Sequence, residues 1–196
     1  MFQRDLRPVD CAALPAFPPG TALPQSAPLR AAGLRLRPAT ADDLDFLRQL
    51  HAAWRMPELL FLPWTAAQKQ AFADDQFQLQ HCHVVRHFPD ADFWIVTDRD
   101  ARPIGRLYLD RAHAEWRLVD ILLASSAQGQ GLGTRLIEWI QHEAGGTPVR
   151  LHVALNNPRA HALYRRLGFA DVPGADGMHR PMLWRSEPED CSLRSG

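Results

Sequence analysis

Residues 118–134 of the chain read LVDILLASSAQGQGLGT, and this stretch decides the fold. A short apolar run predicts a strand, a glycine-rich turn follows it at 128–134, and an amphipathic helix is expected from Arg135 onward. The first N–H groups of a helix are unpaired and carry partial positive charge, and glycines let the backbone approach an anion closely. The segment is therefore suited to bind the phosphates of a pyrophosphate-bearing cofactor.

Two common phosphate-binding loops do not fit this turn. A P-loop needs a lysine directly after its last glycine, whereas the chain has only Lys69, far from the turn. A dinucleotide loop of the G-x-G-x-x-G type that starts at Gly129 would need its third glycine at Thr134. What remains is a strand followed by a Q-x-x-G-x-G pattern, made by Gln128, Gly131 and Gly133.

A second informative segment follows the glycine-rich turn. Val149–Ala154 alternates apolar and polar residues, which predicts a half-buried strand. The next residues, 156–169, read NNPRAHALYRRLGF and predict a short helix. Asn157 is suited to cap it, Pro158 to occupy its first position and Gly168 to end it in the left-handed conformation. Tyr164 falls on the apolar face of this helix, so its ring is expected to pack inward.

Together the two segments resemble the GCN5-related N-acetyltransferase (GNAT) superfamily, from Leu34 to Trp184. The second segment follows the N-x-x-A-x-x-x-Y-x-x-x-G-F pattern, with Asn157, Ala160, Tyr164, Gly168 and Phe169 in register. The resemblance implies an α/β (α+β) GNAT fold, with a central mixed, mostly antiparallel twisted sheet of about six to seven strands flanked by helices. It also implies that coenzyme A binds at the splay between the fourth and fifth strands.

The rest of the chain agrees with this element order. Residues 1–33 are expected to form a proline-rich, irregular N-terminal arm, 34–185 the acetyltransferase domain and 186–196 a C-terminal tail. Threonines at the starts of two expected helices are suited to cap them. The expected elements are strands at 33–38, 93–97, 104–109, 149–154 and 178–184, a strand ending at 122–123, helices at 41–54 and 65–87, and a proline-broken connection at 56–64.

The resemblance also implies roles for residues at the cofactor site. The main chain of Leu122, Leu123 and Ala124 would pair with the pantetheine arm, and Tyr164 would give a proton to the departing thiolate. The remaining cofactor-binding residues implied in this way are Gln128, Gly129, Gln130, Gly131, Leu132, Gly133, Thr134, Asn157, Ala160 and, again, Tyr164.

The general base is harder to assign. Many relatives carry a glutamate where this chain has Arg117. Glu115 lies two residues earlier, on the same face of a regular strand, and is the candidate base, whereas Asp120 would face the opposite way. Both carboxylates could equally be ordinary strand residues, and His113 or His152 could act through water. An acceptor amine of low pKa would need no base.

These features predict the transfer of an acetyl group from acetyl-CoA to a primary amine of a small molecule or peptide, by direct attack in a ternary complex. Transfer of a longer acyl group is one alternative. A non-catalytic acyl-CoA-binding sensor or interaction module is another, for which Arg117 is the main support. The acceptor stays open, with Trp54 and Trp64 as candidate contacts by analogy with the family.

The composition of the chain bears on its binding partners and on its cellular compartment. A formal net charge of zero gives no sign of attraction to nucleic acid or membrane, and no apolar stretch is long enough to span a bilayer. Three scattered cysteines argue against a disulfide framework, so a cytoplasmic enzyme is expected, with a homodimer left open. His83 and His87 have the spacing of two metal ligands but no third ligand nearby, so no metal is expected.

Overall fold

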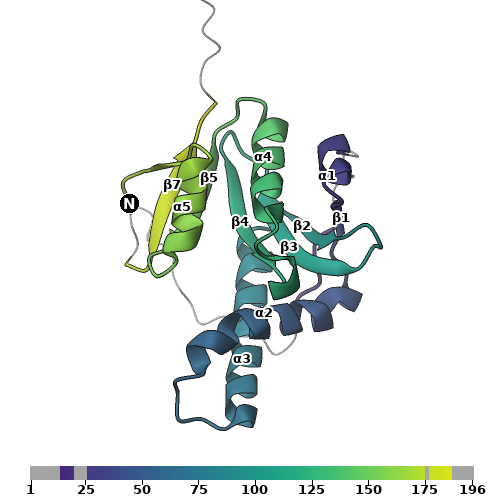
Figure 1. Ribbon diagram of the computed structural model, residues 1–196, viewed down its shortest axis with the longest axis vertical. Coiled ribbons are helices and arrows are strands. Elements are labelled where there is room, and N and C mark those ends of the chain that lie inside the picture. The colour runs from purple at the N-terminus through teal and green to yellow at the C-terminus, as the bar shows by residue number, and fades with distance from the viewer. Residues whose placement is uncertain (1–13, 20–25, 175–176, 187–196) are drawn as a thin grey trace, which may run out of the picture.

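The computed structural model describes residues 14–19, 26–174 and 177–186. They form a seven-stranded sheet in the order β1-β2-β3-β4-β5-β7-β6, with helices packed on both faces (Figure 1). In chain order the elements are α1 (Ala27–Ala31), β1 (Arg35–Pro38), α2 (Leu44–Leu59), α3 (Ala66–His87), β2 (Asp92–Thr97), β3 (Pro103–Asp110), β4 (Trp116–Leu123), α4 (Leu132–Ala144), β5 (Val149–Ala154), α5 (Pro158–Arg166), β6 (Ala170–Asp171) and β7 (His179–Trp184).

The sheet is antiparallel except at its centre, where β4 and β5 run parallel. That parallel ladder joins residues 116–118 to 149–151 and ends at the pair Leu118–Leu151. Beyond this pair β4 continues along β3, and β5 continues along β7. The predicted mixed sheet and the separation of its fourth and fifth strands are therefore confirmed.

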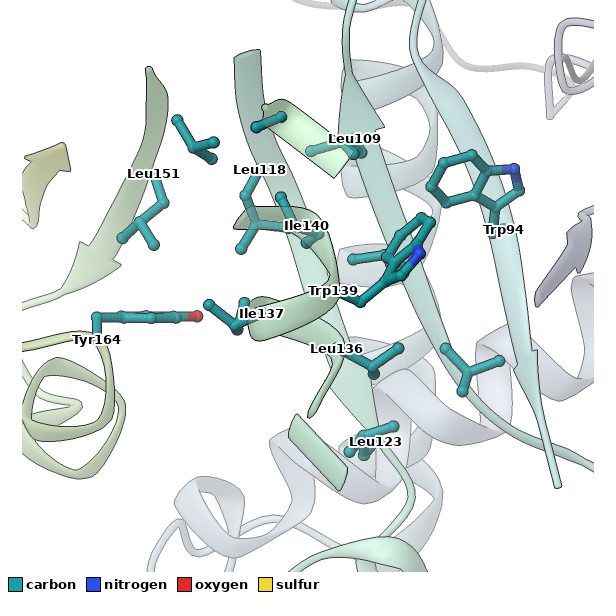
Figure 2. Close-up of a cluster of buried hydrophobic side chains, with 14 of the residues drawn as sticks. Trp94, Leu109, Leu118, Leu123, Leu136, Ile137, Trp139, Ile140, Leu151 and Tyr164 are labelled. Carbon is teal, nitrogen blue, oxygen red and sulfur yellow. The ribbon is translucent and has the colours of Figure 1, made fainter. Parts of the chain in front are cut away.

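One face of the sheet is covered by α4 and α5 (Figure 1). The apolar face of α4 packs on alternate side chains of the central strands, and Trp94 meets Trp139 edge-on with ring centroids 5.6 Å apart (Figure 2). Burying such large apolar side chains is the main force that holds the helix layer on the sheet. The core on this face includes Leu107, Leu109, Leu118, Leu136, Ile137, Ile140 and Leu151.

The other face is covered by α2 and α3. Its core includes Leu47, Phe77, Phe93, Ile95 and Tyr108, together with Phe17 from residues 14–19. Part of the predicted N-terminal arm thus packs on the domain.

A short helix, α1, interrupts the arm, which was expected to be irregular. It is capped by Ser26 and buries Leu29 in the core of the α4 face. Pro28 stands in its first turn, where a proline costs no helical hydrogen bond.

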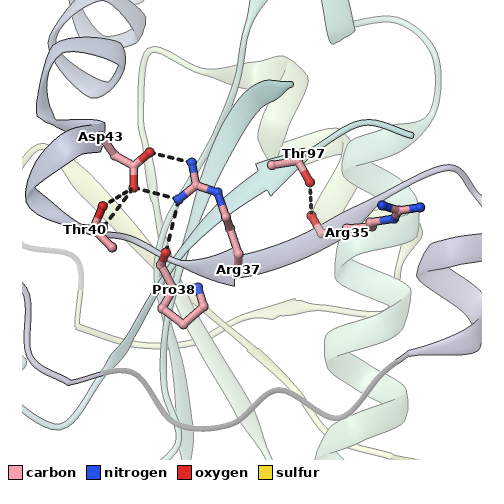
Figure 3. A network of polar contacts seen from close by, with 6 residues as sticks. All are labelled: Arg35, Arg37, Pro38, Thr40, Asp43 and Thr97. Carbon is pink, nitrogen blue, oxygen red and sulfur yellow. Dashed lines mark hydrogen bonds and ion pairs between the residues drawn. The ribbon is translucent and has the colours of Figure 1, made fainter. Parts of the chain in front are cut away.

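A polar network joins β1 to the start of α2 (Figure 3). The Arg37 guanidinium donates to both carboxylate oxygens of Asp43 at 2.6 and 2.8 Å, and the Thr40 N–H donates to Asp43 at 2.9 Å. Burial raises the pKa of Asp43, but the bonds from Arg37 and Thr40 lower it more, and the pKa falls below its usual value. Thr40 occupies the expected N-cap position, where its N–H and hydroxyl both donate to the Asp43 carboxylate, and the first turn after it is a 3-10 turn at Ala41–Asp43.

Two helix boundaries differ from those predicted. The helix α2 runs to Leu59, past Trp54, although it contains Pro57. Pro57 lacks one N–H donor, but it lies in the last turn, and the buried Leu59 continues the packing beyond it. The helix α4 begins at Leu132, three residues before the predicted start at Arg135.

The structure also corrects the expectation about cysteines. Cys82 is buried in α3 and is disulfide-bonded. The argument from cysteines for a reducing compartment is therefore weakened. Among the helices of the described ranges, none has the length and apolar composition needed to cross a membrane.

Candidate active site

The glycine-rich turn presents an open helix N-terminus. Gly129 and Gly131 adopt positive φ angles of 77° and 74°, and Gly131 is the N-cap of α4. Within the described residues, no side chain caps this helix, and a Cβ on Gly129, Gly131 or Gly133 would meet no atom within 4 Å. The first turn of α4 therefore offers N–H groups to a space that an anion can enter, as the diphosphate of coenzyme A requires.

The side chains of the two glutamines in this turn form hydrogen bonds with backbone carbonyls just before it. The Gln128 Nε2 group donates to the carbonyl oxygen of Leu123 at 2.8 Å, and the Gln130 Nε2 group donates to that of Ser126 at 2.8 Å. In this arrangement their side chains fix the path of the turn between β4 and α4. Contact of either residue with a cofactor stays a prediction.

Beyond Leu118, one edge of β4 still pairs with β3, whereas among the described residues the other edge has no strand beside it because β5 has diverged. We call this opening between β4, from Val119 to Leu123, and β5 the gap. The Ala124 N–H donates to the Ile104 carbonyl of β3 at 2.8 Å, so this donor is already used. Adjacent residues of a strand point their backbone groups to opposite edges, and the N–H of Leu123 therefore faces the gap. Of the three main-chain positions predicted to pair with pantetheine, Leu123 has the donor best placed for it.

Tyr164 reaches the same gap from α5. Its ring extends toward Ile137 and β4, with the hydroxyl at the leading end (Figure 2). Burial, followed by the nearby Asp120 charge, raises the pKa of Tyr164 to about 12. The phenol is therefore protonated at neutral pH, as a proton donor must be.

The predicted start of α5 is confirmed. The Asn157 side chain accepts a hydrogen bond from the Ala160 N–H at 3.0 Å, Pro158 opens the helix, and Gly168 follows its end with a φ of 84°. Asn157 therefore caps the helix that carries Tyr164. Its contact with a cofactor, and that of Ala160, stay predictions.

The expected direction of Asp120 is wrong. In the β3–β4 ladder Leu109 pairs with Leu118, but Tyr108 pairs with Asp120, so Val119 is an extra residue in β4. Such a β-bulge reverses the alternation of side chains beyond it. Asp120 therefore lies on the α2/α3 face with Tyr108, the face that Arg117 also occupies.

A buried polar cluster surrounds Asp120 on this face. Its carboxylate pairs with the Arg106 guanidinium at 2.6 Å, and Arg106 in turn donates to Gln80 of α3 at 2.9 Å. His51 of α2 lies near this pair, and its pKa falls to about 4, first because the ring is buried and then because of Arg106 and Arg55. A regular alternation of the sequence could not reveal this cluster.

Glu115 stands at the other end of β4. The Arg150 guanidinium of β5 contacts both of its carboxylate oxygens, and this pairing lowers the pKa of Glu115. Glu115 also precedes the paired part of the β4–β5 ladder, whereas the strands separate only beyond Leu118. The assignment of Glu115 as the base stays a prediction without support from this geometry.

Several other candidates lie apart from the gap. His83 and His87 stack their rings at 4.1 Å, and the described residues hold no cluster of three or more potential metal ligands. Trp54 and Trp64 are both exposed on the α2–α3 region. A cavity of about 490 Å³ borders the glycine-rich turn and is lined in part by Gly33, Arg99 and Gln130, but neither Tyr164 nor Asp120 lines it.

An open helix N-terminus, a separated pair of parallel strands and a buried tyrosine thus lie at one place in the fold, as the sequence predicted. The chain belongs to the acetyltransferase (GNAT) family, whose model matches residues 53–169. Acetyl-CoA is the usual cosubstrate of that family.

A mycothiol acetyltransferase from Acidothermus cellulolyticus is 33% identical over 105 residues, which cover 51% of this chain and 32% of that protein. The chain therefore matches about a third of the length of this curated relative.

Solved structures share the fold at low identity. An acetyltransferase from Thermus thermophilus has a TM-score of 0.59 at 18% identity, covering 78% of this chain and 97% of the other. The PaiA N-acetyltransferase from Thermoplasma acidophilum, solved with coenzyme A, has a TM-score of 0.58 at 17% identity, covering 78% and 99%. A spermidine N-acetyltransferase from Vibrio cholerae, solved with coenzyme A and spermine, has a TM-score of 0.52 at 21% identity, covering 79% and 96%.

Proposed function

We propose that the protein transfers the acetyl group of acetyl-CoA to a primary amine of a small molecule or peptide, by direct attack in a ternary complex. The observation that carries this proposal is the position of the Tyr164 hydroxyl. It points into the gap between β4 and β5, and the open N-terminus of α4 follows the end of β4 at that gap. One extended cofactor can reach both places.

The residues of the gap fit coenzyme A. The first turn of α4, from Leu132 to Thr134, would bind the diphosphate with its N–H groups, and the neighbouring glycines leave room for it. The Leu123 N–H would pair with the pantetheine arm as a further strand would. Bound in this way, acetyl-CoA supplies an activated acyl group as a thioester.

The chain's own groups then serve the transfer. A backbone N–H at the gap would stabilise the oxyanion that develops on the thioester carbonyl. Tyr164, protonated and almost buried, would give its proton to sulfur as the C–S bond breaks. Holding amine and thioester together in one gap supplies a large part of the rate enhancement, because it removes the entropic cost of their encounter.

The acceptor is proposed at the level of a primary amine. The named relatives and neighbours include a mycothiol acetyltransferase and a spermidine N-acetyltransferase, and the second of these was solved with the polyamine spermine bound. The acceptor would approach from the α2/α3 face, where Asp120 borders the gap.

Two measurements test the function. Calorimetry with acetyl-CoA should detect binding, and thiol release should then follow with at least one acceptor from a panel of amino acids, amino sugars, polyamines, arylalkylamines and short peptides. Binding without thiol release for every acceptor would support the sensor or interaction module instead. Failure to bind at millimolar acetyl-CoA would overturn both readings. Acetyl-CoA and longer acyl-CoA thioesters should be compared in the same assay, since a preference for the longer chain would correct the acyl group.

A further inference from the structure

The polar cluster at Asp120 is not explained by the packing of the fold. Arg106 is 2% exposed and Asp120 is 20% exposed, so a full charge pair has been taken largely out of water. Buried ion pairs seldom add net stability, because the loss of hydration offsets their attraction. Stability alone therefore does not explain why Arg106 and Asp120 are buried together, and a functional role is the alternative.

The position of Asp120 supplies that explanation. The β4–β5 ladder ends at Leu118, and Asp120 is the first charged residue of β4 beyond that point. The bulge at Val119 directs its side chain to the α2/α3 face, whereas Tyr164 reaches the gap from the α5 face. A thioester in the gap would thus have Tyr164 on one side and Asp120 on the other.

Arg106 orients the Asp120 carboxylate and leaves part of it accessible. The Nε atom of Arg106 and the Oδ2 atom of Asp120 approach at 2.6 Å, but neither makes an aligned hydrogen bond. Oδ2 is buried, so the exposed part of the Asp120 side chain lies elsewhere on it. Gln80 holds the far side of the guanidinium at 2.9 Å and fixes its orientation. Arg106 and Gln80 are therefore positioning residues for a carboxylate that remains accessible.

We propose that Asp120 binds the acceptor's ammonium group at the gap and accepts its proton, on the face of the sheet opposite Tyr164. This inference rests on the proposed function and names a catalytic residue for it.

The proton balance of the reaction is complete with these two groups. The ammonium gives one proton to the Asp120 carboxylate, and the free amine attacks the thioester carbonyl to form the C–N bond. As the C–S bond breaks, sulfur takes the Tyr164 hydroxyl proton, and the phenolate takes the second proton that nitrogen loses. Asp120 releases its proton to solvent, so one ammonium and one thioester give one amide, one thiol and one proton.

The test compares two variants that each break a buried Asp–Arg pair. Asp120→Asn removes the charge at the gap. Asp92→Asn is the matched control, because Asp92 pairs with Arg111 at 2.7 Å and is buried near the closed end of the sheet. Melting temperature and acetyl-CoA affinity are measured for both, so that misfolding is separated from a catalytic defect. We expect Asp120→Asn to lower kcat by about 100-fold with acetyl-CoA affinity kept, whereas Asp92→Asn keeps kcat near the wild-type value.

A second readout separates proton transfer from mere packing. Among the acceptors that the wild type uses, the defect of Asp120→Asn should be large for an alkylamine, which is protonated at pH 7, and much smaller for an arylhydrazine, which is not. Equal losses for the two acceptors, or equal kcat values for the two variants, would overturn the role of Asp120 and leave the proposed function standing. Absence of thiol release by the wild-type protein with every acceptor would instead overturn the proposed function itself.

Discussion

Tyr164 and Asp120 border the same gap between β4 and β5 from opposite faces of the sheet. Tyr164 belongs to the core beneath α4 and α5, whereas Asp120 pairs with Tyr108 on the face covered by α2 and α3. The two are close enough for the carboxylate charge to help raise the pKa of the phenol. This geometry suits acyl transfer, in which the entering amine loses protons while the departing sulfur gains one.

Tyr164→Phe should lower kcat by about 100-fold, because the variant lacks the proton that the departing sulfur needs. Acetyl-CoA affinity should change little, since the ring and its packing on Phe169 remain. Steady-state thiol release and calorimetry check the two quantities separately. An unchanged kcat would remove Tyr164 from the mechanism.

Gly133→Glu should change stability and cofactor affinity in opposite directions. Glutamate is a better helix former than glycine and is favoured near a helix N-terminus, so the melting temperature should rise. Its charge would repel the diphosphate, and acetyl-CoA affinity should fall by roughly tenfold or more. Gly133→Gln, of equal size and no charge, is the control. If both variants bind acetyl-CoA as the wild type does, the diphosphate lies elsewhere.

Asp43→Asn should destabilise the fold by about 1 kcal/mol at pH 7, because the ion pair with Arg37 is lost while an Asn side chain can still accept from Thr40. Since the pKa of Asp43 is lowered in the folded state, its contribution exists above the unfolded-state pKa and is lost as the pH falls through the folded value. Chemical denaturation at pH 7 and pH 3 should therefore show a smaller difference at pH 3. A difference that does not depend on pH would contradict the ionic origin.

His51 should make the fold sensitive to mild acid. Its pKa is lowered from 6.5 to about 4, so between these values the unfolded chain binds a proton that the folded chain does not. Stability should fall as the pH drops through this window, by up to about 3 kcal/mol. His51→Gln cannot take up this proton, and its melting temperature should decline less between pH 7 and pH 4.5. Parallel curves for variant and wild type would refute the assignment.

Local signals in the sequence located much of the fold. Thr65 and Asn157 cap their helices as predicted, because a cap depends on residues only three positions apart. The strand at Val149–Ala154 has the predicted bounds, since strict alternation marks a half-buried strand. The order of elements also agreed over the described residues, where α1, two 3-10 turns and the two-residue strand β6 were not predicted.

The parts that were missed depend on distant residues. The bulge at Val119 exists only in relation to β3, so counting along β4 gave Asp120 the wrong face. The cluster of Asp120, Arg106 and Gln80 likewise joins two strands and a helix that are separated in sequence. The pairing of Glu115 with Arg150 arises from the parallel ladder and could not be read from either residue alone.

Because the ladder between β4 and β5 is short, few backbone pairs hold the two halves of the sheet together. In the described part of the molecule, β1 to β4 form one set of antiparallel strands and β5 to β7 another, joined along the sheet by three residue pairs. The turn at 145–148 separates the two sets, and Gly145 and Gly146 are exposed there. A backbone cut in that turn would yield two fragments. Because a bound nucleotide thioester would contact both fragments, it should promote their reassembly. The protein is therefore a candidate scaffold for a ligand-dependent split reporter.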